Sequence, residues 1–240
     1  MLKSAKKTGI SVHDRLARGI GERILAGEFA PGTLLPNEAE WGKIYAVSRT
    51  AVREAIKTLT GKGLLLSRPK IGSRVQPREG WNLLDRDVLS WHRSAIDRRS
   101  FAASTQEARR IIEPGIAELA AKKRSAEQLD RLVTALENMR KAKSVPENVG
   151  ADVEFHSALL QAANNALLVP FGIIIEQALA NLFDYTSQRN PHQNLAIRLH
   201  ENIVRAVVAQ DGVAAKLAMV KLIDDTDAVI AATKIQRKKN

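Results

Sequence analysis

Two short helices, each opened by a capping residue and separated only by a brief turn, constrain the fold of this chain most strongly. Asn37 and Glu40 have the spacing of a capping box and predict a helix that ends near Tyr45. Ser48 predicts the N-cap of a second helix, which runs to about Lys62 with apolar residues on one face. Two helices joined so tightly are typical of a helix-turn-helix.

The segments on either side extend this pair to a winged helix. Apolar side chains recur at helical spacing over residues 11–27 and predict a first helix. Residues 64–66 and 74–76 predict two short strands around a polar loop, which together form a hairpin, the wing. We therefore expect residues 1–78 to form a winged helix-turn-helix domain.

The second helix of the pair carries residue types that read DNA. Arg49 and Arg53 are four positions apart, so both project from one face near the helix N-terminus. In a major groove, guanidinium groups placed in this way can bind guanine O6 and N7. Ser48 and Thr50 add hydroxyl groups beside backbone amides that favour a phosphate. The alternative, a merely solvated helix face, is disfavoured by the capped pair and the wing.

The loop of the wing is basic. Arg68, Lys70 and Gly72 lie in it, and a glycine lets the backbone approach a phosphate closely. We expect these three residues to contact the DNA backbone or the minor groove. The charge distribution agrees, because residues 1–80 hold 15 Lys and Arg against 7 Asp and Glu, which places a net +8 of the chain's +11 there.

The remainder of the chain is almost entirely helical in pattern. Seven segments with helical spacing are separated by short turns, which predicts an all-α bundle and a fold that is mainly α. These segments are 83–95, 101–123, 126–142, 147–163, 166–187, 192–210 and 212–235. The first segment belongs to an expected linker over residues 79–98. The other six form an expected second domain over residues 99–240.

The composition excludes several classes of protein. The chain has no cysteine, which rules out disulfides and thiolate metal sites. No apolar stretch follows the lysines at its N-terminus, so a signal peptide is not expected. The longest nearly apolar run, residues 166–175, is about half as long as a membrane span. We therefore expect a cytoplasmic protein that has no membrane partner.

One group of residues in the second domain suggests a metal site. Asp152 and His156 are one turn apart in a predicted helix, and His200 lies in a later helix. A carboxylate and two imidazoles from neighbouring helices can supply three ligands to a divalent ion. The structural alternative is a histidine that is hydrogen-bonded within the core.

Three motifs of the N-terminal third have a recognisable form. They are Gly27-Glu-Phe-Ala-Pro-Gly32, Leu35-Pro-Asn-Glu-Ala-Glu40 and Val47-Ser-Arg-Thr-Ala-Val-Arg-Glu-Ala55. Together they resemble the DNA-binding signature of the GntR superfamily of bacterial regulators. The resemblance implies that Arg49 and Arg53 contact bases or phosphates and that Gly72 is the wing glycine. Some members also carry an arginine after the glutamate of the second motif, where this chain has Ala39.

Residues 101–230 resemble the all-helical ligand-binding domain, called FCD, of the FadR-type branch of this superfamily. In many such domains an Asp and three histidines bind a metal that helps to hold a carboxylate effector. Asp152, His156 and His200 match the first three ligands, whereas the fourth position falls on Leu222. The resemblance thus leaves three possibilities: one divalent metal (Zn or Mn) on three ligands, a polar pocket without metal, or a vestigial site.

The resemblance also implies the class of effector. Arg109 matches the family's pocket arginine, and its planar guanidinium suits a carboxylate. The alternative is a surface arginine paired with Glu113 one turn later, which contributes little energy. The segment 81–91 resembles the linker of GntR regulators that respond to sugar acids. We therefore expect an effector such as galactonate or gluconate, bound near Arg109 and the three metal-ligand candidates.

The features taken together predict a transcriptional regulator, most simply a repressor of a sugar-acid catabolic operon. It would bind a palindromic operator in double-stranded DNA as a homodimer, and it would not be an enzyme. A DNA-packaging protein without an effector is one alternative, but it would leave the helical domain without a task. A metal-dependent lyase or hydrolase is another, but it would lack an obvious general base and leave the basic N-terminal third unexplained.

Overall fold

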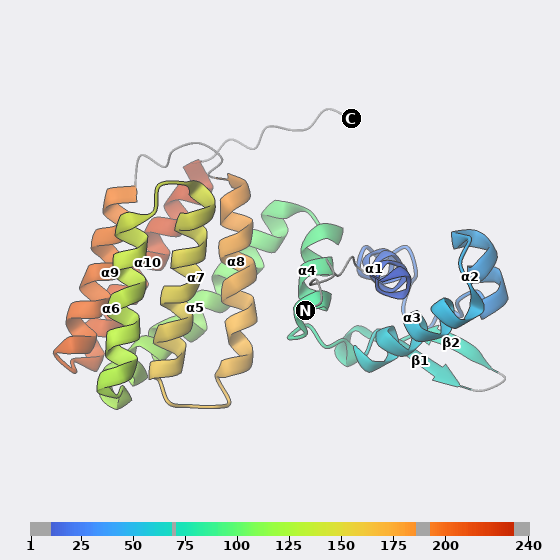
Figure 1. Ribbon diagram of the computed structural model, residues 1–240, viewed down its shortest axis with the longest axis horizontal. Helices are drawn as coiled ribbons and strands as arrows, with labels where there is room; N and C mark the ends of the chain where they lie inside the picture. Colours follow the sequence, from blue (N-terminus) through green and yellow to red (C-terminus); the bar gives the residue numbers. More distant parts are fainter. Residues whose placement is uncertain (1–10, 69–70, 186–192, 233–240) are drawn as a thin grey trace, which may run out of the picture. The chain divides into compact units, whose positions relative to one another are not determined.

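The computed structural model describes residues 11–68, 71–185 and 193–232. The chain divides into two compact units, residues 1–97 and 98–240, and each has its own hydrophobic core. The first unit combines helices with a hairpin, and the second is a bundle of helices (Figure 1). The expected linker, residues 79–98, falls almost entirely within the first unit.

The first unit is a winged helix-turn-helix. Its elements are α1 (Val12–Leu25), α2 (Glu38–Tyr45), α3 (Arg49–Gly61), β1 (Leu65–Arg68), β2 (Gly72–Val75), a 3-10 turn (Arg78–Gly80) and α4 (Arg86–Ala95). The two strands are antiparallel, with Leu65 opposite Val75 and Arg68 opposite Gly72. Both strands reach further into the wing loop than the sequence predicts. Leu34 forms an isolated antiparallel bridge with Arg74 of β2.

Side-chain caps begin the helices at the expected residues. The Ser11 side chain accepts a hydrogen bond from the first turn of α1. Asn37 and Glu40 form the reciprocal bonds of a capping box on α2. The Ser48 side chain accepts a hydrogen bond from the Ala51 N–H and caps α3. Between α2 and α3, Ala46 adopts a left-handed conformation (φ 52°), so the chain turns at once from one helix into the next.

Helix α4 packs against α1 and completes the core of the first unit. Val88 and Trp91 are buried in this core. Trp91 lies over Gly21, where an added Cβ would come within 2.6 Å of the indole ring. Only glycine therefore permits this close approach between the two helices. The helix begins at Arg86 rather than at residue 83, because the Asp85 side chain accepts hydrogen bonds from the first turn and caps it there.

The second unit is all α within the residues that the structure describes. Its helices are α5 (Arg98–Lys123), α6 (Ala126–Lys141), α7 (Val145–Ala162), α8 (Gly172–Tyr185), α9 (Gln193–Val208) and α10 (Gly212–Ala232), with a 3-10 turn (Val169–Phe171) before α8. Helix α5 continues through Pro114 without ending. The predicted helix ends near 187, 192 and 235 lie outside the described residues.

Helix α8 begins six residues later than the sequence predicts, at Gly172 instead of 166. The Asn165 side chain accepts a hydrogen bond from the backbone of Leu167, which holds a turn after α7. Pro170, which has no backbone N–H to donate within a helix, lies in the 3-10 turn that precedes α8. No helix in the described part of the chain is long and apolar enough to cross a membrane.

Candidate DNA interface and effector site

The predicted DNA-reading residues of α3 lie together on its outer face. Ser48, Arg49, Thr50 and Arg53 are all exposed, near the N-terminal end of the helix. The opposite face of α3 is buried in the core of the winged helix through Val52, Ala55, Ile56 and Leu59. The helix therefore presents two guanidinium groups and two hydroxyl groups to solvent from a fixed position.

An ion pair that the sequence analysis did not anticipate holds one of these arginines. The Arg53 Nε lies 3.2 Å from Glu38 Oε1, and its Nη2 lies 3.2 Å from Glu38 Oε2. The contact joins α3 to the first residue of α2, and both side chains remain exposed. Glu38 thus orients the guanidinium of Arg53, whereas Arg49 makes no ion pair with any described residue.

The structure describes the glycine of the wing and one of the two cations that the sequence predicts there. Arg68 is exposed at the end of β1, and Gly72 opens β2 with a φ of 99° that favours glycine. Arg74 Nη1 donates to the backbone carbonyl of Gly32, which fastens the hairpin to the turn before α2. Lys70, predicted to contact DNA, lies outside the described residues.

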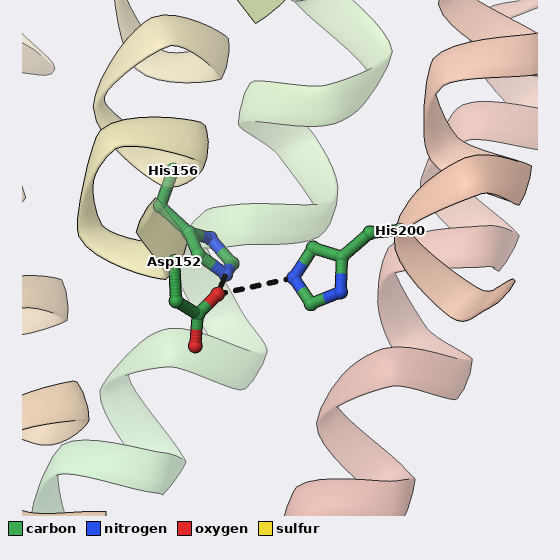
Figure 2. A group of neighbouring side chains, drawn as sticks. All are labelled: Asp152, His156 and His200. Carbon is green, nitrogen blue, oxygen red and sulfur yellow. Dashed lines mark hydrogen bonds and ion pairs between the residues drawn. The ribbon is translucent and has the colours of Figure 1, made fainter. Parts of the chain in front are cut away.

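In the second unit, α7 and α9 bring the three metal-ligand candidates together (Figure 2). Asp152 Oδ1 lies 3.1 Å from His200 Nε2 and 3.4 Å from His156 Nε2. One ligand atom of each residue lies within 4.8 Å of the others. Both imidazoles are buried, whereas the side chain of Asp152 is 22% exposed. The group is therefore approached from the side of Asp152.

The other ring nitrogen of each histidine has a partner that orients the ring. His156 Nδ1 lies 2.7 Å from Glu113 Oε2, and His200 Nδ1 lies 2.7 Å from the carbonyl oxygen of Ala196. Both neighbours are acceptors and favour a proton on Nδ1, so each ring turns Nε2 toward Asp152, where a metal ion would take the place of the Nε2 proton. Metal-binding histidines are oriented by such contacts. His156 Nε2 is also buried without a hydrogen-bond partner among the described residues, so the donor set fits a divalent ion.

Glu113 is part of the site, although the sequence suggested it only as a surface partner of Arg109. Arg109 Nε lies 2.5 Å from Glu113 Oε1, and Arg109 Nη1 donates to Gln106 Oε1 over 3.0 Å. The side chains of Arg109 and Glu113 are each only 1% exposed, so the alternative of a surface pair is wrong. A chain of contacts thus runs from Arg109 through Glu113 and His156 to Asp152.

The charges in this chain of contacts stabilise one another. Burial alone would raise the pKa of Glu113, but the charges of Arg109 and His156 lower it to about 2. Burial would likewise raise the pKa of Asp152, but the two histidines beside it hold that pKa well below its usual range. Burial would lower the pKa of His156, but Glu113 and Asp152 raise it to about 9. The site therefore favours positive charge between the buried carboxylate of Glu113 and the partly exposed carboxylate of Asp152.

The fourth ligand position of the family is apolar in this chain. Leu222, on α10, is 3% exposed and belongs to the hydrophobic core of the second unit. Its side chain offers no donor atom. Among the described residues, the candidate metal ligands are therefore one carboxylate and two imidazoles.

Comparison with known proteins decides the family. Residues 13–75 match the bacterial regulatory proteins of the gntR family, and residues 105–225 match the FCD domain. This chain belongs to the GntR family. Its combination of a GntR winged helix with an FCD domain places it in the FadR-type branch, as the motifs predict. Members of this family are transcriptional regulators that bind DNA, so this protein is a DNA-binding regulator and not an enzyme.

Curated relatives cover nearly the whole chain. The HTH-type transcriptional regulator YieP of Escherichia coli is 35% identical over 88% of this chain and 92% of its own length. The galactonate operon transcriptional repressor of Escherichia coli is 34% identical over 88% of this chain and 93% of its own. Among solved structures, a GntR protein of Streptococcus agalactiae is 27% identical, with a TM-score of 0.53, and covers 90% of this chain and 100% of its own.

Proposed function

We propose that this protein represses a sugar-acid catabolic operon and that a sugar acid such as galactonate or gluconate changes its affinity for the operator. Relatives support this class of operon: the galactonate operon repressor is 34% identical, and the Uxu operon regulator of Escherichia coli is 28% identical. The observation that carries the proposal is the buried group of Asp152, His156 and His200, whose three ligand atoms converge. Operator binding implies that the protein acts in the cytoplasm.

Asp152, His156 and His200 would hold one divalent ion, Zn or Mn. When bound, the ion supplies a Lewis acid that attracts the carboxylate of the effector. The protein prepares this site by orienting His156 through Glu113 and His200 through the carbonyl of Ala196. Because Leu222 adds no fourth ligand, coordination positions remain for oxygen atoms of the effector.

Arg109 is proposed to favour the carboxylate of the effector as well. Two of its nitrogen atoms are engaged, Nε by Glu113 and Nη1 by Gln106. A direct contact with the effector would therefore use Nη2 or the second N–H of Nη1. In either case the guanidinium balances the charge of Glu113, so that the carboxylate of a ligand is not repelled by an uncompensated anion.

The DNA interface is proposed to consist of the outer face of α3 and the wing. Arg49 and Arg53 would read base edges, and Ser48 and Thr50 would contact phosphates. Wing contacts would come from Arg68, Lys70 and Gly72. We assign residues 1–78 to DNA binding, 79–98 to the link and 99–240 to effector binding and dimerisation. Two copies would place two recognition helices on a palindrome.

Coupling between effector and DNA would pass through the end of α4. Lys62 Nζ lies 2.7 Å from Asp85 and 2.8 Å from Asp87, so α3 is tied to the start of α4. Helix α4 therefore moves with the winged helix, and the junction at residues 96–97 becomes the place where the two units change their relation. The effector must bind one arrangement more tightly than the other, since equal affinity for both shifts nothing.

A thermal-shift panel of sugar acids on the purified protein tests this function. The panel contains D-galactonate, D-gluconate and the corresponding neutral sugars, each with added Zn²⁺ or Mn²⁺ and with EDTA. We expect stabilisation by an acid but not by its neutral sugar, and loss of that stabilisation with EDTA. No shift with any acid would refute the sugar-acid assignment. A shift that EDTA leaves unchanged would refute the role of the metal.

A further inference from the structure

Two buried carboxamides on α8 have atoms without a partner. The side chains of Gln177 and Asn181 are one turn apart, and these residues are 7% and 1% exposed. Gln177 Oε1 and Asn181 Oδ1 accept no hydrogen bond from any described residue. Buried polar atoms in folded proteins are nearly always paired. Two unpaired acceptors on one face of one helix therefore indicate a partner beyond the described residues, and water or a ligand can supply it.

The geometry of the bundle places both residues at the height of the metal-ligand group. Helices α7 and α8 run antiparallel (Figure 1), and Gly172 at the start of α8 lies against Leu160 near the end of α7. Both helices rise by about 1.5 Å per residue. Positions near 176 and 180 are therefore level with His156 and Asp152. Helix α8 also packs on α5, which carries Glu113, so its buried face adjoins the same part of the bundle.

We propose that Gln177 and Asn181 recognise the hydroxyl groups of the effector and so select a polyhydroxylated acid over a short one. This inference rests on the function proposed above, in which the carboxylate of the effector lies at Asp152, His156 and His200. A carboxamide both accepts and donates, which matches a hydroxyl group, whereas its oxygen repels a carboxylate. The metal-ligand group binds the acid end, and the two carboxamides bind the chain of hydroxyl groups.

Replacing the carboxamides by apolar side chains of similar size tests this role. The variants are Gln177→Met and Asn181→Leu, and Gln161→Met, at an exposed position of α7, is the matched control. Calorimetry measures the affinity of each protein for Mn²⁺, for D-galactonate and for glycolate, a 2-hydroxy acid without the hydroxyl chain. Denaturation without a ligand measures stability.

We expect each variant to lose about tenfold in affinity for D-galactonate, the effect of about one neutral hydrogen bond. Affinities for Mn²⁺ and glycolate should stay at the wild-type values. Stability without a ligand should not fall, because an apolar group replaces an unpaired buried acceptor. The control should match the wild type in every measurement.

Three results would overturn the inference in distinguishable ways. If the wild type binds D-galactonate and both variants bind it equally well, the carboxamides do not contact the effector, and the proposed function stands. If the variants unfold more easily and lose D-galactonate and glycolate alike, the carboxamides are structural and satisfied by water. If the wild type binds neither acid, the proposed function fails, and this inference fails with it.

Discussion

The buried pair of Arg109 and Glu113 leads to the sharpest prediction for stability and metal binding together. Each side chain is 1% exposed, and the Nε–Oε1 distance is 2.5 Å. Substitution Glu113→Gln leaves the guanidinium buried without its counter-ion, which costs about 3–5 kcal/mol. Whole domains are stable by only about 5–15 kcal/mol, so this single change removes a large share of the stability.

The same substitution also releases the ring of His156. Glu113 Oε2 lies 2.7 Å from His156 Nδ1, and an amide can present a donor there instead of an acceptor. Loss of such an orienting partner typically reduces metal affinity by about 10- to 100-fold. Glu113→Gln should therefore weaken Zn²⁺ or Mn²⁺ binding even at temperatures where the protein remains folded.

A double variant separates the two effects. In Arg109→Met/Glu113→Leu no buried charge remains unpaired, so the free energy of unfolding should recover most of the loss. Metal affinity should remain low, because the acceptor for His156 Nδ1 is still missing. Thermal denaturation and calorimetry with Mn²⁺ measure the two quantities, and about 2–4 °C of Tm is expected per kcal/mol, hence a fall of roughly 6–20 °C for Glu113→Gln.

Arg110→Met is the control on the same helix. Arg110 forms ion pairs with Asp224 and Asp227, but its side chain is 41% exposed. Such exposed pairs are worth about 0–1 kcal/mol, so little change is expected. A loss below about 1 kcal/mol for Glu113→Gln would refute the reasoning about the buried pair. Wild-type metal affinity in the double variant would refute the orienting role of Glu113.

Three further predictions concern the DNA interface and its coupling to the effector. Arg49→Ala should reduce the preference for a selected operator over scrambled DNA by about 1–3 kcal/mol in fluorescence anisotropy, and an unchanged affinity ratio would exclude base reading. Arg68→Ala should instead weaken binding to operator and scrambled DNA alike, and it should lower the slope of log affinity against log salt concentration by about 1. A loss of affinity for the operator alone would contradict a contact with the DNA backbone. Lys62→Met breaks the ion pairs with Asp85 and Asp87 and should reduce the change in operator affinity that the effector causes, while binding without effector persists. A change as large as in the wild type would exclude these ion pairs from the coupling.

Local chemistry is the part of this protein that can be predicted from the sequence alone. The caps at Asn37 and Ser48, the turn between their helices and the pair Arg49 and Arg53 all depend on residues within a few positions of one another. The winged helix and the exposed face of α3 were therefore predictable in place and type. The spacing of Asp152 and His156 suggested a ligand pair, but only the resemblance to a family supported His200 as their partner, because 43 residues separate it from His156 along the chain.

Contacts between distant segments are decided only in the folded structure. Glu113 looked like a surface partner, yet the packing of α5 on α7 buries it against His156. The same applies to Glu38 of α2, which forms an ion pair with Arg53 of α3. It also applies to Gln177 and Asn181, because only the packing of the bundle shows that their side-chain oxygens have no hydrogen-bond partner among the described residues. Side-chain spacing specifies which face of a helix is apolar, but the packing of other helices on that face decides which polar groups lose water. Burial then sets which charges must pair and which acceptors remain available for a ligand.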